Sequence, residues 1–395
     1  MTDAVSLTPA ISLPSGFKIR EVLAQPRVTG AAASPPNLGS LAAFVGNWIG
    51  TGFNTIFRPD SPETPTPLPV PISGDNILEL NLTTETLSFS PSLGSVPNRG
   101  MVQADAFLNG VPYLQAISDV TTGQSVGIHL EPGLWMSVPQ TTNPTEPPTL
   151  VRMASIPHGT TILAQGTSTP FAGTPNIPAV SITPTIAVPL GSPAGGEIRF
   201  ASQTAASPGT PRIPQDLSAF ITAGTITQGI LDDPNTVLRT HNNGLVITGG
   251  LEISISTLPA APLFGGGIDN IAFLLGNPSA LVNPVNAVQN AQTLQMTATF
   301  WIESVQHTII VPRFDPGQPS LTLKPEASIP GHPVPAFAVR PPIPIPEPRP
   351  VTVTSTQIQY SQKVMLNFNG LTWPHVSVAT LVPAGPIAVP PSAWQ

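Results

Sequence analysis

The sequence predicts an all-β fold, an antiparallel β-barrel of about ten strands with large proline-rich insertions. Three observations lead to this prediction. Runs that alternate between apolar and polar residues recur along the 395 residues, and the one convincing helical stretch is residues 214–234. The 52 prolines and 33 glycines supply many turns. An apolar fraction of 40% with a net charge of only −7 differs from the composition of a disordered chain.

The first expected strand is residues 44–57, FVGNWIGTGFNTIF, where glycines alternate with bulky apolar residues as in a strand that bends at a barrel corner. Asn109-Gly110 predicts a hairpin turn within residues 101–120. Turns are also expected at Pro132-Gly133 and at Pro157-His158-Gly159. The helical stretch is expected to be two short helices broken near Gly224. Further strands are expected at residues 77–90, 125–139, 149–166, 244–257, 295–312, 351–368 and 373–383.

These segments divide the chain into a barrel and the segments that surround it. Proline every few residues limits a segment to short edge strands or polyproline-like stretches. The expected parts are an N-terminal arm (1–40), the first part of the barrel (41–167), a proline-rich insertion with short helices and edge strands (168–295), barrel strands (296–312), a proline-rich connector (313–350), the closing barrel strands (351–384) and a tail (385–395).

Composition excludes several classes of function. The chain has no cysteine, so it has no disulfide, no cysteine-ligated zinc, no iron–sulfur cluster and no thiol nucleophile. Its 14 basic residues form no cluster, which argues against binding to nucleic acid or to an anionic membrane. No apolar run is long enough to span a bilayer, and the N-terminus lacks a signal-peptide pattern. We therefore expect a cytoplasmic protein, and the sequence is compatible with a homo-oligomer.

Three stretches resemble the nitrobindins, which are calycin-type β-barrels. Residues 41–56, LAAFVGNWIGTGFNTI, carry the Gly-x-Trp-x-Gly-x-Gly pattern of the opening strand, with Trp48 at its centre. Residues 128–133, IHLEPG, resemble a mid-barrel element with His129 and Glu131 at alternate positions. Residues 358–383 resemble the last two strands, in which a histidine is followed by alternating apolar residues. His375 holds that place.

The resemblance implies that His375 is the proximal ligand of a ferric heme b. An open iron position would then bind nitric oxide or react with peroxynitrite or peroxide, and the sequence leaves open whether this is enzymatic turnover. A b-type heme needs no covalent cysteine. Ser377 and Ala379 are small enough to leave a slot beside the imidazole, and Trp373 and Trp48 are candidate contacts to the cofactor. His158 is a candidate second axial or distal residue at a barrel mouth.

Alternatives remain open from the sequence. His375 can equally be a core histidine that hydrogen-bonds inside the protein. His129 and Glu131 can form a structural pair, or join His158 and His375 in a three-histidine metal site. The protein as a whole can be a lipocalin-type carrier of an apolar small molecule without heme, or a structural or assembly protein with a filled barrel. His241, His307 and His332 are expected to be structural.

Overall fold

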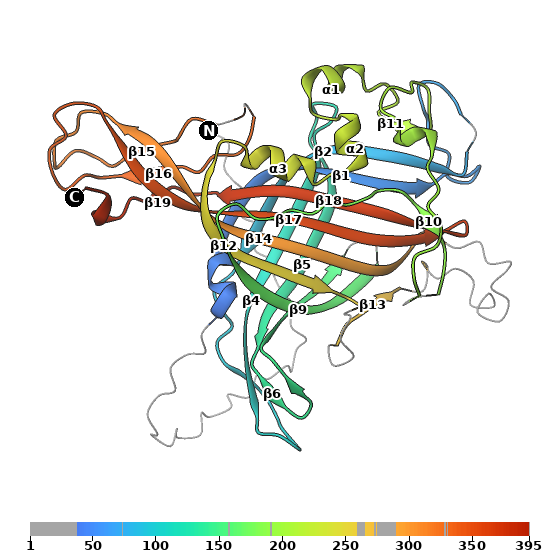
Figure 1. The fold of residues 1–395 in the computed structure, drawn as a ribbon, viewed down its shortest axis with the longest axis horizontal. Coiled ribbons are helices and arrows are strands. Elements are labelled where there is room, and N and C mark those ends of the chain that lie inside the picture. The colour runs from blue at the N-terminus through green and yellow to red at the C-terminus, as the bar shows by residue number, and fades with distance from the viewer. Residues whose placement is uncertain are drawn as a thin grey trace, which may run out of the picture. The chain divides into compact units, whose positions relative to one another are not determined.

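The protein folds into a closed antiparallel barrel of ten strands, seen in a computed structural model (Figure 1). The structure describes residues 38–394 except 73, 157–158, 190–191, 259–264, 272–273, 275–289, 328 and 330. The barrel strands are β1 (Gly46–Pro59), β2 (Asn76–Phe89), β4 (Ala106–Asp119), β5 (Val126–Val138), β8 (Thr149–Ile156), β9 (Thr160–Ala172), β12 (Val246–Ser256), β14 (Gln292–Val311), β17 (Arg349–Phe368) and β18 (Leu371–Pro383). The predicted fold class is therefore confirmed.

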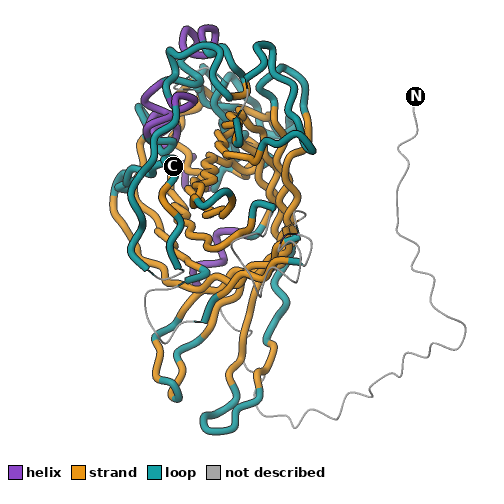
Figure 2. The backbone as a smooth tube through the Cα atoms, turned by 90° about the vertical axis from the view of Figure 1, so that its right-hand side faces the viewer, coloured by secondary structure: helices purple, strands orange, loops and turns teal. Residues whose placement is uncertain are grey.

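The ten strands follow one another around the barrel in chain order, and β1 then pairs with β18 to close it. Figure 2 shows the strands as a ring. Closure brings the two backbones very close at Gly50 and Gly52. A Cβ atom added to Gly50 would lie 2.0 Å from the carbonyl oxygen of Thr380, and one added to Gly52 would lie 2.1 Å from that of Val378. The alternating glycines of the first strand are thus required by its contact with the last strand.

Two predicted turns are wrong, because the chain passes through both positions as continuous strand. Asn109 and Gly110 lie within β4 and pair with Ser137 and Met136 of β5. An Asn-Gly hairpin turn needs a positive φ at both residues, and neither Asn109 nor Gly110 is among the described residues with a positive φ. Pro132-Gly133 lies within β5, where the missing Cβ makes room for the Tyr113 ring, whose Cε1 atom is 2.4 Å from the position a Cβ would take.

The hairpin between β8 and β9 does turn at Gly159, whose φ is +90°. Pro157 and His158 of the same predicted turn lie outside the described residues. The final hairpin turns at Asn369 and Gly370, with φ values of 49° and 74°. Both central residues therefore have the left-handed backbone of a two-residue hairpin loop.

The insertion after β9 packs outside the barrel, and two of its three α-helices were expected. α1 (Ser218–Ala223) ends at Gly224 with φ +73°, and α2 (Gln228–Asp232) follows, as the pattern predicts. α3 (Thr236–Asn242) was not expected, and it lies against β18. Short elements complete this region: β10 (Thr185–Ile186), η2 (Ala201–Gln203) and β11 (Arg212–Ile213). A further short strand, β13 (Gly267–Asn270), follows β12 and pairs with β9. The predicted range 168–295 also contains β12, which is a barrel strand and not part of an insertion.

One arginine organises much of this proline-rich insertion. Arg212 is fully buried, and its guanidinium donates hydrogen bonds to backbone carbonyls. The acceptors are Ser202, Thr204, Ala205, Ser207, Pro214 and Gln215, at 2.8–3.5 Å. A segment rich in proline lacks many backbone donors, so its carbonyls need partners from elsewhere. The guanidinium supplies five donors from a single side chain.

A second, smaller core lies beside the barrel. β15 (Leu321–Leu323), β16 (Phe337–Val339) and β19 (Ile387–Ala388) form a three-stranded sheet that packs on the ends of β14 and β17. The C-terminal residues belong to this core, because β19 pairs with β16 and Trp394 of η5 (Pro391–Trp394) is buried. The residues expected to be a tail are thus an integral part of the fold. The remaining elements are η1 (Gly39–Phe44), β3 (Val96–Asn98), β6 (Thr141–Thr142) and β7 (Thr145–Glu146).

Candidate functional site: a polar cavity inside the barrel

Side chains from six strands converge on a cavity of about 220 Å³ inside the barrel, which we call the His375 cavity. It is partly open to solvent. Its lining is mostly polar: Asn54, Glu79, Asn81, Gln115, His129, Tyr360, Gln362, His375 and Ser377, with Ile56, Ile117 and Ile128. Contributions from β1, β2, β4, β5, β17 and β18 place the cavity inside the ring of strands. The inward faces of these strands therefore carry amides, hydroxyls and two imidazoles where a closed barrel usually carries apolar side chains.

The imidazole of His375 faces this cavity and has a side-chain partner. Nε2 of His375 lies 2.8 Å from Nδ2 of Asn54, and the same amide nitrogen donates to Oγ of Ser377 at 2.7 Å. An amide nitrogen can only donate, so Nε2 of His375 is the acceptor and carries the lone pair. The neutral ring then holds its proton on Nδ1. A histidine in an otherwise apolar strand is expected to need a hydrogen-bond partner, and Asn54 on the neighbouring strand is that partner.

The structure brings together some of the predicted site residues and separates others. Ser377 and His129 line the cavity with His375. Trp48 does not: it lies six residues before Asn54 on β1, roughly 20 Å away at the rise of a strand, and its Nε1 donates to the carbonyl of Phe44. Trp373 is 1% exposed, and its Nε1 donates to the carbonyl of Phe368. Both tryptophans are core residues in this structure.

Trp373 belongs to an aromatic cluster and is not among the residues that line the cavity. Its ring stacks on Phe368 at 4.6 Å between centroids, and it also contacts Phe57 and Phe200. His158 lies outside the described residues, so its predicted distal role stays a prediction. The three-histidine metal site includes His158 and stays untested for the same reason. Within the described ranges, no three His, Asp or Glu side chains are grouped so as to hold a metal ion.

A buried ion pair lies directly beneath His129. Nε2 of His129 is 3.2 Å from Oε2 of Glu131, and Oε1 of Glu131 accepts a hydrogen bond from Nη2 of Arg152 at 2.5 Å. Arg152 also donates to the Tyr113 hydroxyl at 2.8 Å and to Oε1 of Gln362 at 2.7 Å. Burial alone would raise the pKa of Glu131, but the charge of Arg152 and the contacts of His129 outweigh it and hold the pKa at about 2. Glu131 is therefore ionised at neutral pH.

A second buried carboxyl lies beside the cavity and behaves in the opposite way. Glu85 accepts hydrogen bonds from the Tyr360 hydroxyl and from Nε2 of Gln115, both at 2.7 Å. Burial raises its pKa to about 7, and these hydrogen bonds only partly offset the burial. Tyr360 and Gln115 line the His375 cavity, so they connect Glu85 to it. A carboxyl with a pKa close to neutral therefore lies one side chain away from the cavity.

The opposite end of the barrel is filled by aromatic rings. Phe44 of η1 stacks on Phe89 at 4.8 Å between centroids and lies 5.4 Å from the Trp135 ring. Trp135 meets Phe300 edge to face at 5.2 Å. The interior thus changes along its length from aromatic, through the buried ion pair, to the polar His375 cavity.

The remaining histidines lie outside the barrel. Nδ1 of His241 in α3 is 2.8 Å from Nδ1 of His332, and Nε2 of His241 donates to Oε1 of Gln357. Nε2 of His307 is 2.8 Å from the Ser355 hydroxyl. Burial lowers the pKa of both His241 and His307 to about 4. These contacts join α3 and the connector to β17, in keeping with the structural role predicted for them.

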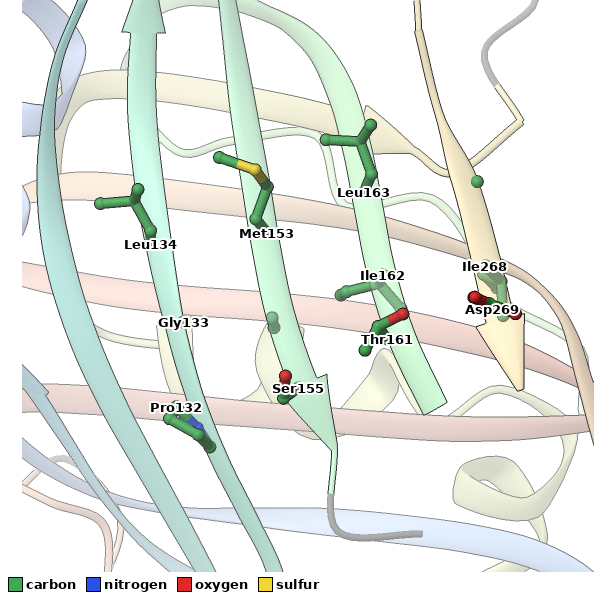
Figure 3. A pocket seen from close by; sticks show the side chains of 12 residues that line it. Pro132, Gly133, Leu134, Met153, Ser155, Thr161, Ile162, Leu163, Ile268 and Asp269 are labelled. Atoms are coloured by element: carbon green, nitrogen blue, oxygen red, sulfur yellow. The ribbon is translucent and has the colours of Figure 1, made fainter. Parts of the chain in front are cut away.

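A shallow apolar groove of about 490 Å³ crosses the outer surface of β5, β8, β9 and β13. Figure 3 shows Leu134, Met153 and Leu163 side by side on three neighbouring strands, with Ile268 and Asp269 on β13. The groove has no imidazole and no cation in its lining. We therefore do not treat it as the functional site.

The polar partners that define the cavity are not predicted from the sequence. Asn54, Gln115 and Gln362 lie on separate strands, and each looks like an ordinary surface residue in its own stretch of sequence. A signal was present in β1, where Asn54 continues the inward alternation of Gly50 and Gly52. The other two could be found only once the strand neighbours were known.

Comparison with known proteins adds little to this picture. No family model and no curated protein matches the chain. One solved structure, the crystal structure of Rv2717c from M. tuberculosis, is similar at a TM-score of 0.32 and 10% identity, over 89% of this chain and 98% of that one. None of the described helices is both long enough and apolar enough to cross a membrane.

Proposed function

We propose that the protein binds a ferric heme b at the open end of its barrel, with Nε2 of His375 as the proximal ligand. One observation carries the proposal: an imidazole nitrogen with a lone pair faces a cavity inside the barrel. A proximal histidine must be neutral and must present such a nitrogen to the iron. The sequence resemblance to nitrobindins selects the same histidine independently of this geometry.

The residues around His375 fit a heme in their donor chemistry. The hydrogen bond from Asn54 requires the tautomer with the proton on Nδ1, which leaves Nε2 as the ligating atom. Asn54 occupies that lone pair in the present structure, so its amide has to turn away when a metal binds. Because Asn54 also donates to Ser377 at 2.7 Å, it retains a partner when it does so.

Volume limits how much of the cofactor the barrel can enclose. Pockets that bury drug-sized ligands measure about 300–1,000 Å³. The His375 cavity, at about 220 Å³, is smaller and partly open. It can enclose only part of a porphyrin. A bound heme would supply an iron able to bind nitric oxide or to react with peroxynitrite or peroxide, while the protein's own residues hold and orient it.

A second candidate function is the binding of a small polar ligand without heme. The observation that favours it is the lining, in which amides, hydroxyls and imidazoles outnumber the three isoleucines. Such groups recognise a ligand by hydrogen bonds. A lipocalin-type carrier, one of the alternatives from the sequence, would hold an apolar ligand. Because the lining is mostly polar, we propose a polar ligand for this second candidate.

The test is a titration of the purified full-length protein with hemin, followed by visible absorption. The variants are His375→Ala and, as a matched control, His332→Ala, because His332 is a partly exposed histidine outside the barrel. Thermal unfolding of each variant checks that it is folded. We expect one Soret band at one heme per chain in the wild type and in His332→Ala, and its loss in His375→Ala.

A band that is the same in His375→Ala refutes the assignment of the proximal ligand. No band in the wild type refutes heme binding. In that case a screen of small polar fragments by NMR, read from the His375 and His129 ring signals, tests the second candidate. Binding of neither hemin nor any fragment would refute both candidates and favour a structural or assembly role.

A further inference from the structure

A second cavity lies on the outer face of the barrel wall, beneath a strap of the insertion. It measures about 340 Å³ and is lined on one side by strap residues and on the other by β14, β17 and β18; the strap residues are Thr185, Val188, Pro189, Ser192 and Ala194. We call it the strap pocket. Its volume falls within the range of pockets that hold small organic ligands. Because successive side chains of a strand point to opposite faces, Lys363 and Met365 face this pocket while Gln362 faces the His375 cavity.

Backbone hydrogen bonds anchor the described residues at both ends of the strap to the barrel and to each other. β10 pairs with β18 through Thr185 and Thr372, and the Ala187 amide donates to the carbonyl of Gly370 at 3.1 Å. The Ile186 amide donates to the carbonyl of Gly196 at 3.0 Å, which ties the two ends of the strap together.

A single charged side chain, Lys363, lines the strap pocket. It rises from β17 between Thr297 of β14 and Val376 of β18, and it is partly buried. In the part of the chain that the structure describes, Lys363 takes part in no ion pair, and every ion pair uses arginine or histidine as the cation. Lys363 is thus a partly buried lysine that no described carboxylate pairs with, and an anionic ligand in the pocket would supply that partner.

The other lining groups indicate which kind of anion would suit Lys363. The hydroxyls of Thr185, Ser192 and Thr297 can donate hydrogen bonds, whereas Val188, Leu294 and Met365 are apolar. The pocket has neither an arginine fork nor a second cation, which are the usual means of holding a phosphate. One ammonium with a few hydroxyls suits a monoanion, and the apolar wall suits a hydrocarbon tail.

We propose that the strap pocket binds a small amphipathic monocarboxylate, whose carboxylate pairs with Lys363 and whose tail packs on the apolar wall. This site is separate from the His375 cavity, because the barrel wall lies between the two. The proposal therefore does not depend on whether the protein binds heme.

Octanoate is the probe for the test, measured by isothermal titration calorimetry on the full-length protein without hemin. The variants are Lys363→Met, which keeps the length of the chain and removes the charge, and Lys363→Arg, which keeps the charge. Lys324→Met is the matched control, because Lys324 is an exposed lysine elsewhere. Octanol serves as the uncharged analogue and inorganic phosphate as an anion without a tail.

We expect one octanoate per chain and an affinity that falls about ten- to hundredfold in Lys363→Met, the loss typical of a hydrogen bond to a charged group. Lys324→Met binds as the wild type does, and Lys363→Arg retains most of the affinity. Octanol binds more weakly, and Lys363→Met does not alter its affinity.

Three results would overturn the proposal. The first is no binding of octanoate by the wild type. The second is equal affinity in Lys363→Met, provided that its thermal unfolding matches the wild type. The third is phosphate competing as well as octanoate does, which would mean that the lysine attracts any anion.

Discussion

Replacing Arg152 by methionine should destabilise the protein strongly, and in a way that depends on pH. Arg152 is 2% exposed and its partner Glu131 is 0% exposed. Methionine fills much of the same space but leaves the Glu131 carboxylate buried without its cation. Removing one partner of a buried ion pair costs about 3–5 kcal/mol of unfolding free energy. The hydrogen bonds to Tyr113 and Gln362 are lost as well, so we expect a value in the upper part of that range.

The sign of the pH dependence gives the sharper test. In the wild type the folded-state pKa of Glu131 is about 2, below its ordinary value of 4.5. Its stabilising contribution is therefore complete above about pH 4.5 and is lost as the pH falls toward 2. In Arg152→Met burial acts without the opposing guanidinium, so the pKa should rise above 4.5. The variant should then gain stability, relative to the wild type, as the pH falls from 7 to 4.

The assay is urea unfolding at pH 7, 5 and 4, followed by tryptophan fluorescence. Arg58→Met is the control, because the Arg58–Glu79 pair has side chains 41% and 25% exposed and should contribute less than about 1 kcal/mol. The double variant Glu131→Gln/Arg152→Met removes both charges and should recover most of the loss. A single-variant loss no larger than that of Arg58→Met, or a loss that does not shrink at low pH, refutes the reasoning.

Two further predictions concern the barrel seam and the second buried carboxyl. Gly50→Ala should lower the unfolding free energy by about 3 kcal/mol, because the new Cβ would lie 2.0 Å from the Thr380 carbonyl oxygen. Gly127→Ala, where no atom lies within 4 Å, should change it little, and equal effects in urea unfolding would contradict the close approach. Burial raises the pKa of Glu85 to about 7, so the wild type should lose stability relative to Glu85→Gln as the pH rises from 5 to 9. A constant difference in unfolding midpoint over that range would mean that Glu85 does not titrate there.

Two of the Asn-Gly dipeptides, Asn109-Gly110 and Asn369-Gly370, show where the prediction of turns from sequence fails and where it succeeds. Asn369-Gly370 forms the turn between β17 and β18 with both residues at positive φ. Asn109-Gly110 continues through β4, where Asn109 is buried and its side-chain oxygen accepts from Ser92 and from the Gly110 amide. A Cβ at Gly110 would lie 2.4 Å from the carbonyl oxygen of Trp135. The two dipeptides have the same sequence. Asn109-Gly110 stays extended because it pairs with β5.

His375 could be selected from the sequence because a histidine in an otherwise apolar strand needs a partner. Alternation also placed Ser377 on the same face, and both residues line the cavity. The same alternation places Trp373 on that face, but its ring packs against Phe57 and Phe368 and does not line the cavity. Alternation gives the face of a strand but not what lies opposite that face.

The sequence by itself determined the class of the fold, because alternation at period two and dense turn residues are local properties. It also determined the first and last strands, two of the three α-helices between β9 and β12, and the histidine that faces the cavity. The tertiary structure alone decided that the barrel interior is polar at one end, that Arg152 neutralises Glu131, and that Lys363 lines a covered pocket. Each of these depends on residues more than 20 positions apart that strand pairing brings together. Such pairing is set by the free energy of the whole barrel, which no single stretch of the chain encodes.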